Sequence, residues 1–536
     1  MIRRKPIPIV DLFAGPGGLG EGFASYCADG VNNAFCIGLS IEKEAVAYRT
    51  LTLRAVFRHL VGTPAEEWYY DYIRGNIDAI EFRSNRVVRE AFACAAEEAR
   101  QFELGQVDEA RIDSDIRRVL GGETDWVLIG GPPCQAYSLA GRSRRANDRT
   151  FQHDEKHFLY REYLRIIKEH EPAVFVMENV KGLLSSQHSG SRMFTRIIED
   201  LARPSRGLDY DIRSAVVNDY GIGLVPEDYV IHAERYGVPQ RRHRVILIGV
   251  RSDLSDAPMV ALKPQEPITI ADAIGDLPRI RSRLSERGDS TTEWQQALKD
   301  GLEGIDGWGT SGEAGLRKVM VGAIRASRNL ADTGDAFVKY PAGLIRRGDE
   351  FSQWIVRPKL GGYVQHVARS HMRSDLARYL FASAFAQKFK FSPRLDIFPK
   401  RLLPDHRNAR WHFGDTNMPF KDRFRVHCEH EPAWTVVSHI AKDGHYYIHY
   451  DPSQCRSLSV REAARVQSFP DDYYFEGNRT QQYIQVGNAV EVMCRQHCLA
   501  HEQLQLWVGL ANGQAKEDPR FGRTGEHQLP KAPAAE

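Results

Sequence analysis

Residues 126–135, Trp-Val-Leu-Ile-Gly-Gly-Pro-Pro-Cys-Gln, join an apolar run to a stiff turn. Trp126 to Ile129 has the length and content of a buried parallel strand. Two prolines restrict the backbone that follows, and Cys134 comes directly after them. Because α/β sheets bind ligands at the carboxyl ends of their strands, this pattern predicts a cysteine at a functional edge. From this stretch alone, the thiol is either a nucleophile or a buried packing residue.

Similar strands are expected on both sides of this one. Between residues 7 and 250, short apolar runs alternate with longer helical patterns, which is typical of a parallel α/β sheet. The segment from about 81 to 120 has a helical pattern with little turn chemistry, and we interpret it as a helical insertion. The expected strands are Ile7–Phe13, Ala34–Ser40, Asp125–Gly130, Ala173–Glu178 and Arg244–Val250.

The remaining chain has a different character. Residues 252–451 mix turns, aromatic and basic residues, and we expect them to form a second, mixed domain. Within them, Lys388 to Arg410 interleaves cations with aromatic rings, which suits either nucleic-acid contact or a solvated surface. Helical patterning returns after residue 452, and the polar tail at 512–536 is expected to be disordered.

Composition excludes several classes of protein. The 536 residues are too many for one compact core, and a net charge of +2 makes any nucleic-acid surface local. No run approaches the roughly 18 apolar residues of a membrane span, and no signal peptide is recognisable, so we expect a cytoplasmic protein without membrane contact. The eight cysteines include no CxxC pair, so we expect reduced thiols and no metal site.

A glycine-rich loop, Phe13-Ala-Gly-Pro-Gly-Gly-Leu-Gly20, follows the first expected strand. Its spacing satisfies GxGxxG, where glycines let the backbone approach an adenosine cofactor closely. Glu42, after the second strand, would then hold ribose hydroxyls. A nicotinamide dinucleotide or a plain tight turn also suits the pattern, although Pro16 removes an amide that could have faced a pyrophosphate.

Four more motifs contain chemically useful groups. Met177-Glu178-Asn179 ends a strand with a carboxylate, which is either a reacting group or a helix cap. Gln240-Arg-Arg-His-Arg244 brings closely spaced cations, although such a pair also occurs on surfaces. Arg461-Glu462 follows Ser459 or Ser457 as the helix cap. Tyr483 to Val490, which includes Gly487-Asn488-Ala489, is expected to begin the last long helix.

Together, in this order, the six motifs resemble the C5-cytosine DNA methyltransferases over roughly residues 7–250 and 430–500. The resemblance implies a Rossmann-like, S-adenosylmethionine-dependent methyltransferase domain at 1–251, to which the chain returns at 452–511. It implies a target-recognition domain at 252–451. It also implies a monomer that acts on double-stranded DNA, with a cognate restriction endonuclease or phage-defence proteins as partners.

The resemblance also implies residue roles. Cys134 would attack C6 of the cytosine, Glu178 would act at N3, and Arg242 would contact the base with Arg244 as support. The cofactor contacts would be Phe13, Ala14, Gly15, Gly17, Gly18, Leu19, Glu42, Asn76, Ile77, Pro132, Asn488 and Ala489. The DNA contacts would be Gln135, Ser138, Arg142, Arg144, Arg145 and Gln240.

The chain departs from the family pattern at three positions. Asn76 precedes Ile77 where an aspartate is usual, and its amide oxygen still accepts a hydrogen bond from adenine. Tyr137 replaces a phenylalanine, and Glu491 stands where a proline is common. No side chain is assigned as the base that removes the C5 proton.

Three other functions compete with DNA methylation. Methylation of tRNA uses the same motifs, but about 200 residues between Ser252 and Asp451 suit the readout of a DNA sequence. A catalytically dead DNA-binding protein would lack Cys134, Glu178 or the arginines, and all are present. An NAD-dependent dehydrogenase would need only the glycine-rich loop, which leaves the other motifs unexplained.

Overall fold

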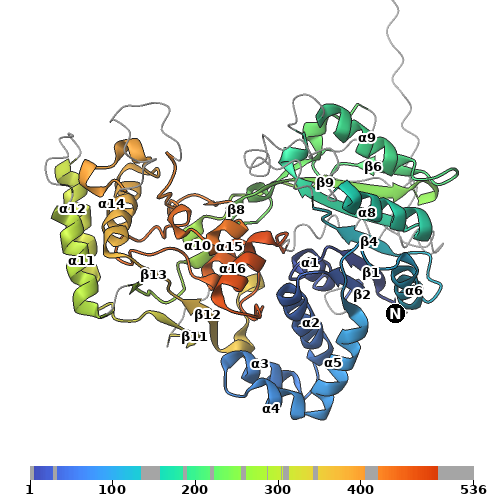
Figure 1. Cartoon of the computed structure of the whole chain (residues 1–536), viewed down its shortest axis with the longest axis horizontal. Helices are drawn as coiled ribbons and strands as arrows, with labels where there is room; N and C mark the ends of the chain where they lie inside the picture. The colour runs from blue at the N-terminus through green and yellow to red at the C-terminus, as the bar shows by residue number, and fades with distance from the viewer. Residues whose placement is uncertain are drawn as a thin grey trace, which may run out of the picture.

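The computed structural model describes residues 5–27, 33–133, 157–184, 190–217, 223–254, 261–285, 288–303, 305, 313–341, 348–404 and 421–492. A sheet with helices on both faces forms one part, and a group of long helices lies at the opposite end of the molecule (Figure 1). Shorter helices lie between the two parts. Among the described helices, none is both long enough and apolar enough to cross a membrane.

The central sheet has eight strands in the order β3-β2-β1-β4-β5-β9-β6, with β7 also paired to β9. The first five strands in this order are parallel, whereas β9 runs antiparallel to β5, β6 and β7. The strands are β1 (Ile7–Leu12), β2 (Phe35–Glu42), β3 (Ala99–Gln101), β4 (Val127–Gly130), β5 (Val174–Val180), β6 (Tyr210–Arg213), β7 (Val230–His232) and β9 (His243–Arg251).

This sheet confirms the α/β class and all five expected strands, but two expectations were wrong. The sheet is not wholly parallel, because residues 233–242 are too few for the crossover of a dozen or more residues that would make β7 and β9 parallel. The segment 81–120 is not purely helical, because it contains the edge strand β3. Three residues of β3 give too short a pattern to be recognised in the sequence.

Helices cover both faces of the sheet because its strands are apolar on both sides. Ile9 packs with Leu19 and Phe23 of α1 on one face, while Val10 packs on the other face. The helices of this part are α1 (Gly18–Ala24), α2 (Ala45–Leu60), α3 (Glu66–Arg74), α4 (Ala79–Ser84), α5 (Arg86–Glu98), α6 (Glu109–Leu120), α8 (His157–His170) and α9 (Gly190–Ala202).

The second part has its own apolar core. The long helices α11 (Thr291–Glu303) and α12 (Glu313–Ala326) pack against α14 (Arg373–Phe389), whose side chains are buried on nearly every face. Three two-stranded ladders complete it: β10 (Arg283–Leu284) with β13 (Ser370–His371), β11 (Gly334–Lys339) with β12 (Gly362–Val367), and β8 (Gln240–Arg241) with β14 (Ala433–Trp434). Its helices are α10 (Ile270–Ile274), α11 (Thr291–Glu303), α12 (Glu313–Ala326), α13 (Glu350–Ile355) and α14 (Arg373–Phe389).

Two late helices, α15 (Val460–Val466) and α16 (Arg479–Asn488), lie between the two parts (Figure 1). Ser459 caps α15, as one of the two expected caps, in a reciprocal pair with Glu462. Both helices share an apolar core with α10 and with residues 433–447. The described part of 452–511 therefore packs against the second part as well as against the sheet.

A buried ion network joins the late segment to the sheet. Arg54 of α2 pairs with Glu21 of α1 and, at 3.2 Å, with Asp472. The hydroxyl of Tyr473 donates to the carbonyl oxygen of Pro16 in the glycine-rich loop. Although burial favours its neutral form, Arg54 and Arg58 lower the pKa of Glu21. Asp472 and Tyr473 thereby link the late segment to α2 and to the glycine-rich loop.

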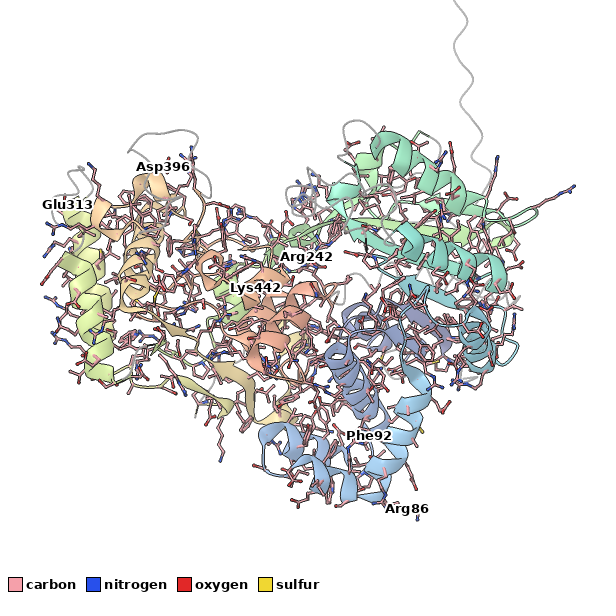
Figure 2. The ribbon with its side chains drawn as sticks, viewed as in Figure 1. Arg86, Phe92, Arg242, Glu313, Asp396 and Lys442 are labelled. Carbon is pink, nitrogen blue, oxygen red and sulfur yellow. The ribbon has the colours of Figure 1, made fainter. Side chains whose placement is uncertain are left out.

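We expect Arg54→Ala to lower the free energy of unfolding by about 3–5 kcal/mol, because it removes the cation shared by two buried carboxylates. Glu21 and Asp472 would keep only their longer ion pairs with Arg58 and Arg357. Urea unfolding followed by circular dichroism measures this change. The matched control is Arg86→Ala, which removes an exposed arginine paired with Glu90 (Figure 2) and should leave the unfolding midpoint unchanged. Equal midpoints for the two variants would show that the Arg54 network does not stabilise the fold.

Candidate active site

The glycine-rich loop has room for a ligand at Gly15. Gly15 has a φ of +58°, and a Cβ added there would meet no atom within 4 Å. Its N–H donates to Oε2 of Glu42 at 2.8 Å, and the N–H of Glu44 donates to Oε1 at 2.7 Å. Burial raises the pKa of Glu42. Each carboxylate oxygen keeps a lone pair, so Glu42 suits ribose hydroxyls while it anchors the loop.

Other glycines of the loop are explained by packing. A Cβ at Gly18 would lie 2.1 Å from the carbonyl oxygen of Val490, and one at Gly20 would lie 2.9 Å from Oδ2 of Asp11. Leu19 points into the core on one face of the sheet. Gly18 and Leu19 could therefore contact a cofactor only through their backbone atoms. Phe13, Ala14 and Gly17 belong to the same turn, in which Phe13 also has a positive φ.

Asn76 and Ile77 do not lie with this loop, so their assignment as cofactor residues is corrected. They follow α3 rather than a strand, and the amide of Asn76 donates to Asp71 at 2.9 Å. Ile77 packs against the core formed by α2, α3 and α5. The strand beside β2 is β3, which ends at Gln101, so Phe102 holds the position expected of Asn76.

The ends of β4 and β5 are held together beside the loop that leads to Cys134. A Cβ at Gly131 would lie 2.9 Å from Oε2 of Glu178, so glycine permits the carboxylate to approach the backbone. The side-chain amide of Asn179 donates to the carbonyl oxygen of Pro132 at 3.2 Å. Several predicted residues lie outside the described residues: Cys134, Gln135, Ser138, Arg142, Arg144 and Arg145.

The two arginines of β9 and its preceding turn have different partners. Nε of Arg244 lies 2.7 Å from Oε1 of Glu178. Arg242 is buried where the sheet meets the second part (Figure 2), and it donates to the carbonyl oxygens of Val436 at 2.9 Å and Ala489 at 2.7 Å. Arg244 therefore lies beside the carboxylate, whereas Arg242 already donates to two backbone carbonyl oxygens.

A pocket surrounds this carboxylate. Burial raises the pKa of Glu178, against the opposing charges of Arg244 and Arg242, and Glu491 raises it further. Burial, with the charge of Arg244, lowers the pKa of Arg242 to about 10. The neutral acid is thus favoured more than in an exposed glutamate. The lining residues are Glu178, Ile231, Ala233, Val238, Arg242, Arg244, Ile246, Val490 and Glu491.

Comparison with known families decides what this arrangement is. A model of the family described as C-5 cytosine-specific DNA methylase matches residues 99–501. The chain belongs to this family. It is a DNA (cytosine-5-)-methyltransferase (EC 2.1.1.37).

The similarity to known proteins extends over most of this methylase. The type II methyltransferase M.Bpa9945I of Bacillus paralicheniformis is 30% identical over 501 residues, covering 90% of this chain and 95% of that protein. M.XorII of Xanthomonas oryzae is 36% identical over 381 residues, covering 70% and 68%. A solved structure described as a prophage-encoded DNA modification methyltransferase (E. coli) has a TM-score of 0.51 at 17% identity, covering 94% and 99%, which shows the shared fold.

The structure corrects the predicted role of Gln240 as a DNA contact. Its side chain is fully buried, its Nε2 donates to Oε1 of Gln467 at 2.8 Å, and its Oε1 accepts from the N–H of Val436 at 2.6 Å. A buried amide with both ends occupied is unavailable to DNA. Gln240 instead joins β8 to the segments that contain Val436 and Gln467.

The segment after α16 connects the cofactor loop to the arginines. The motif at 483–490 was expected to begin a helix, but α16 begins at Arg479 and ends at Asn488, which is exposed. The carbonyl oxygen of Ala489 accepts from Arg242. Glu491, which the sequence analysis noted only as a departure, is buried with an oxygen 2.9 Å from Nε of Arg242. Because Glu491 lines the same pocket as Glu178, its charge raises the pKa of Glu178.

We expect Glu491→Gln to move the alkaline limb of the pH–activity profile to lower pH. The substitution removes a negative charge that raises the pKa of Glu178 and leaves the arginines free to lower it. Activity on the alkaline side should fall, because less of Glu178 is then neutral at a given pH. Methyl transfer measured across pH tests this, and an unchanged or alkaline-shifted limb would contradict it.

Proposed function

We propose that this methylase forms a covalent bond between Cys134 and C6 of a cytosine flipped out of duplex DNA, and so permits methylation of C5. The observation that supports this most is the Glu178 carboxylate, buried beside Arg244 and against Gly131, three residues before Cys134. A base placed in this pocket would meet an acid and a cation on one side, with the thiol entering from the neighbouring strand end.

Each group has a defined task in this proposal. Cytosine C5 is a poor nucleophile, and addition of a thiolate to C6 makes it enamine-like. That addition moves negative charge toward N3 and O2. Glu178 in its neutral form donates a proton at N3, and Arg244 stabilises the charge nearby. After methyl transfer, a base removes the C5 proton, Cys134 leaves C6 as the thiolate, and the N3 proton returns to Glu178.

S-adenosylmethionine is the proposed cofactor, and when bound it supplies the methyl group as an electrophile. The open space at Gly15 and the hydrogen-bonded carboxylate of Glu42 fit its adenosine half. Phe13, Ala14, Gly17 and Pro132 lie around the same edge, and the backbone of Asn488 and Ala489 borders it. We keep these residues as proposed cofactor contacts and omit Asn76 and Ile77.

The DNA contacts are proposed from chemistry and order along the chain. A cytosine inside a duplex is stacked on both faces, so it must leave the stack before a thiol can reach C6. Residues 138–145 include Ser138, Arg142, Arg144 and Arg145, which would contact the backbone of the opened duplex. Residues 252–451 would form the target-recognition domain that selects the sequence.

We further propose that the methylase protects DNA in a restriction–modification system or a related phage-defence system. M.Bpa9945I and M.AgeI of Thalassovita gelatinovora are both named type II methyltransferases. The proposed partners are double-stranded DNA and a cognate endonuclease or defence proteins. The proposed state is a cytoplasmic monomer.

Two measurements test the substrate. The purified protein should transfer tritiated methyl groups to duplex DNA and not to tRNA, which the same motifs would also permit as substrate. Bisulfite sequencing of DNA from cells that express it should then reveal protected cytosines within one recurrent sequence. Transfer to tRNA alone, or protected cytosines without a common sequence, would overturn the proposal of a sequence-specific DNA enzyme.

A further inference from the structure

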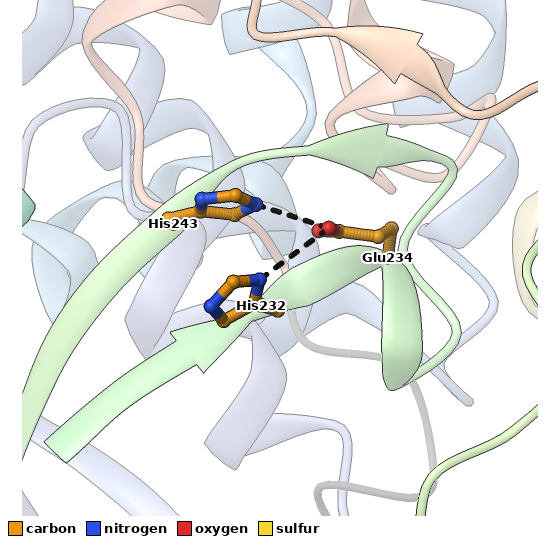
Figure 3. A group of neighbouring side chains, drawn as sticks. All are labelled: His232, Glu234 and His243. Atoms are coloured by element: carbon orange, nitrogen blue, oxygen red, sulfur yellow. Dashed lines mark hydrogen bonds and ion pairs between the residues drawn. The ribbon is translucent and has the colours of Figure 1, made fainter. Parts of the chain in front are cut away.

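Three side chains that could ligate a metal meet behind the pocket, although the sequence analysis expected no metal site. His232 on β7, Glu234 two residues further along the chain and His243 on β9 point toward one another (Figure 3). One ligand atom from each lies within 4.8 Å of the others. In the strand register His232 pairs with His243, which places the two rings side by side with centroids 3.9 Å apart.

We propose that His232, Glu234 and His243 bind a divalent transition-metal ion, with Zn²⁺ as the best fit. Two imidazoles and one carboxylate are a common protein ligand set for Zn²⁺, with water in the fourth position. Mg²⁺ and Ca²⁺ prefer oxygen ligands and larger coordination numbers, so an imidazole pair selects against them.

The distances suit such an ion. Ligand atoms at tetrahedral angles and normal Zn²⁺ bond lengths lie about 3.4 Å apart. In the structure, Oε1 of Glu234 lies 3.0 Å from Nε2 of His243 and 3.7 Å from Nδ1 of His232. The second carboxylate oxygen, Oε2 of Glu234, is buried without a hydrogen-bond partner among the described residues. Small rotations of partly exposed side chains would complete the geometry.

The ion would link the two strands that border the catalytic pocket. Ile231 and Ala233 line the pocket on either side of His232, and Arg242 and Arg244 line it on either side of His243. A bond from each histidine to one ion would therefore fix β7 against β9. We place the ion in a positioning role for Arg244, with no part in the chemistry at the cytosine.

The test uses untagged full-length protein stripped of metal, titrated with Zn²⁺ by calorimetry and with Co²⁺ by visible absorption. We expect one ion per chain, a tetrahedral Co²⁺ spectrum, and a rise in Tm of about 5 °C in excess Zn²⁺. His232→Gln and Glu234→Gln should each weaken binding by more than about 10-fold, since each removes one of three protein ligands.

A second group with two histidines and one carboxylate provides the matched control. Asp443 lies 4.0 Å from His439 and 3.9 Å from His445, a looser arrangement. His439→Gln should leave binding and the Tm shift unchanged. Absence of stoichiometric binding, or equal binding by wild type and both ligand variants, would overturn the proposal. Because binding is read without methyl transfer, this outcome is distinguishable from failure of the proposed function.

Discussion

Methyl transfer by the Cys134→Ala variant should fall on the order of 10⁴-fold or more, while its affinity for S-adenosylmethionine stays close to wild type. The expected loss is large because without a thiolate at C6 the C5 atom stays a poor nucleophile. Cofactor affinity should persist because the substitution leaves unchanged Gly15, in the loop after β1, and Glu42, at the end of β2. Single-turnover methylation and equilibrium cofactor binding measure the two effects separately.

A mechanism-based trap sharpens this prediction. Duplex DNA that contains 5-fluorocytosine at the target should form a stable adduct with the protein, because fluorine cannot leave C5 as a proton does. The adduct should be absent for Cys134→Ala and present for Cys94→Ala, whose cysteine is exposed on α5. Turnover by Cys134→Ala, or an adduct at another residue, would end the covalent mechanism.

The sequence was most informative where one local pattern determines the geometry. The run Trp126 to Ile129 is buried on both faces of the sheet, so its apolar content identifies it as a central strand. The location of Glu178 follows in the same way, because a carboxylate at the end of an apolar run has to lie near the carboxyl end of the strand. These positions need no knowledge of distant contacts.

Predictions failed where a distant segment decides a residue's environment. Arg242 and Arg244 are alike in the sequence. Distant groups distinguish Arg242, namely the carbonyl oxygens of Val436 and Ala489 and the carboxylate of Glu491. Asn76 matched a motif by its neighbours, whereas the true third strand follows 23 residues later, after two intervening helices. Gln240 was expected to contact DNA because its neighbours in the sequence do not reveal that it is buried against Gln467.

The metal ligands were missed for a related reason. His232 and Glu234 are separated by one residue in the chain, but His243 joins them only through the pairing of β7 with β9. The sequence contains neither the CxxC pairs nor the helical histidine spacing by which metal sites are usually recognised. A hairpin predicted across 230–251 would have brought the three together.

Glu178→Gln should lower kcat by about 10²- to 10⁴-fold, the usual contribution of a general acid. Glutamine keeps the volume of the side chain and a donor, but it cannot transfer a proton to N3. Because burial raises the pKa of Glu178, its neutral form persists to higher pH than in an exposed glutamate, and it is lost as pH rises. The wild-type rate should therefore have an alkaline limb that the variant lacks.

The comparison with Glu491→Gln distinguishes proton donation from packing. Both substitutions replace a buried carboxylate in the same pocket, and each breaks an ion pair with an arginine. If Glu178 donates the proton, the alkaline limb disappears in Glu178→Gln and only moves in Glu491→Gln. If both carboxylates merely hold their arginines, the two variants should lose activity equally at every pH. That parallel loss, measured as kcat from pH 6 to 9, would remove Glu178 from the chemical step.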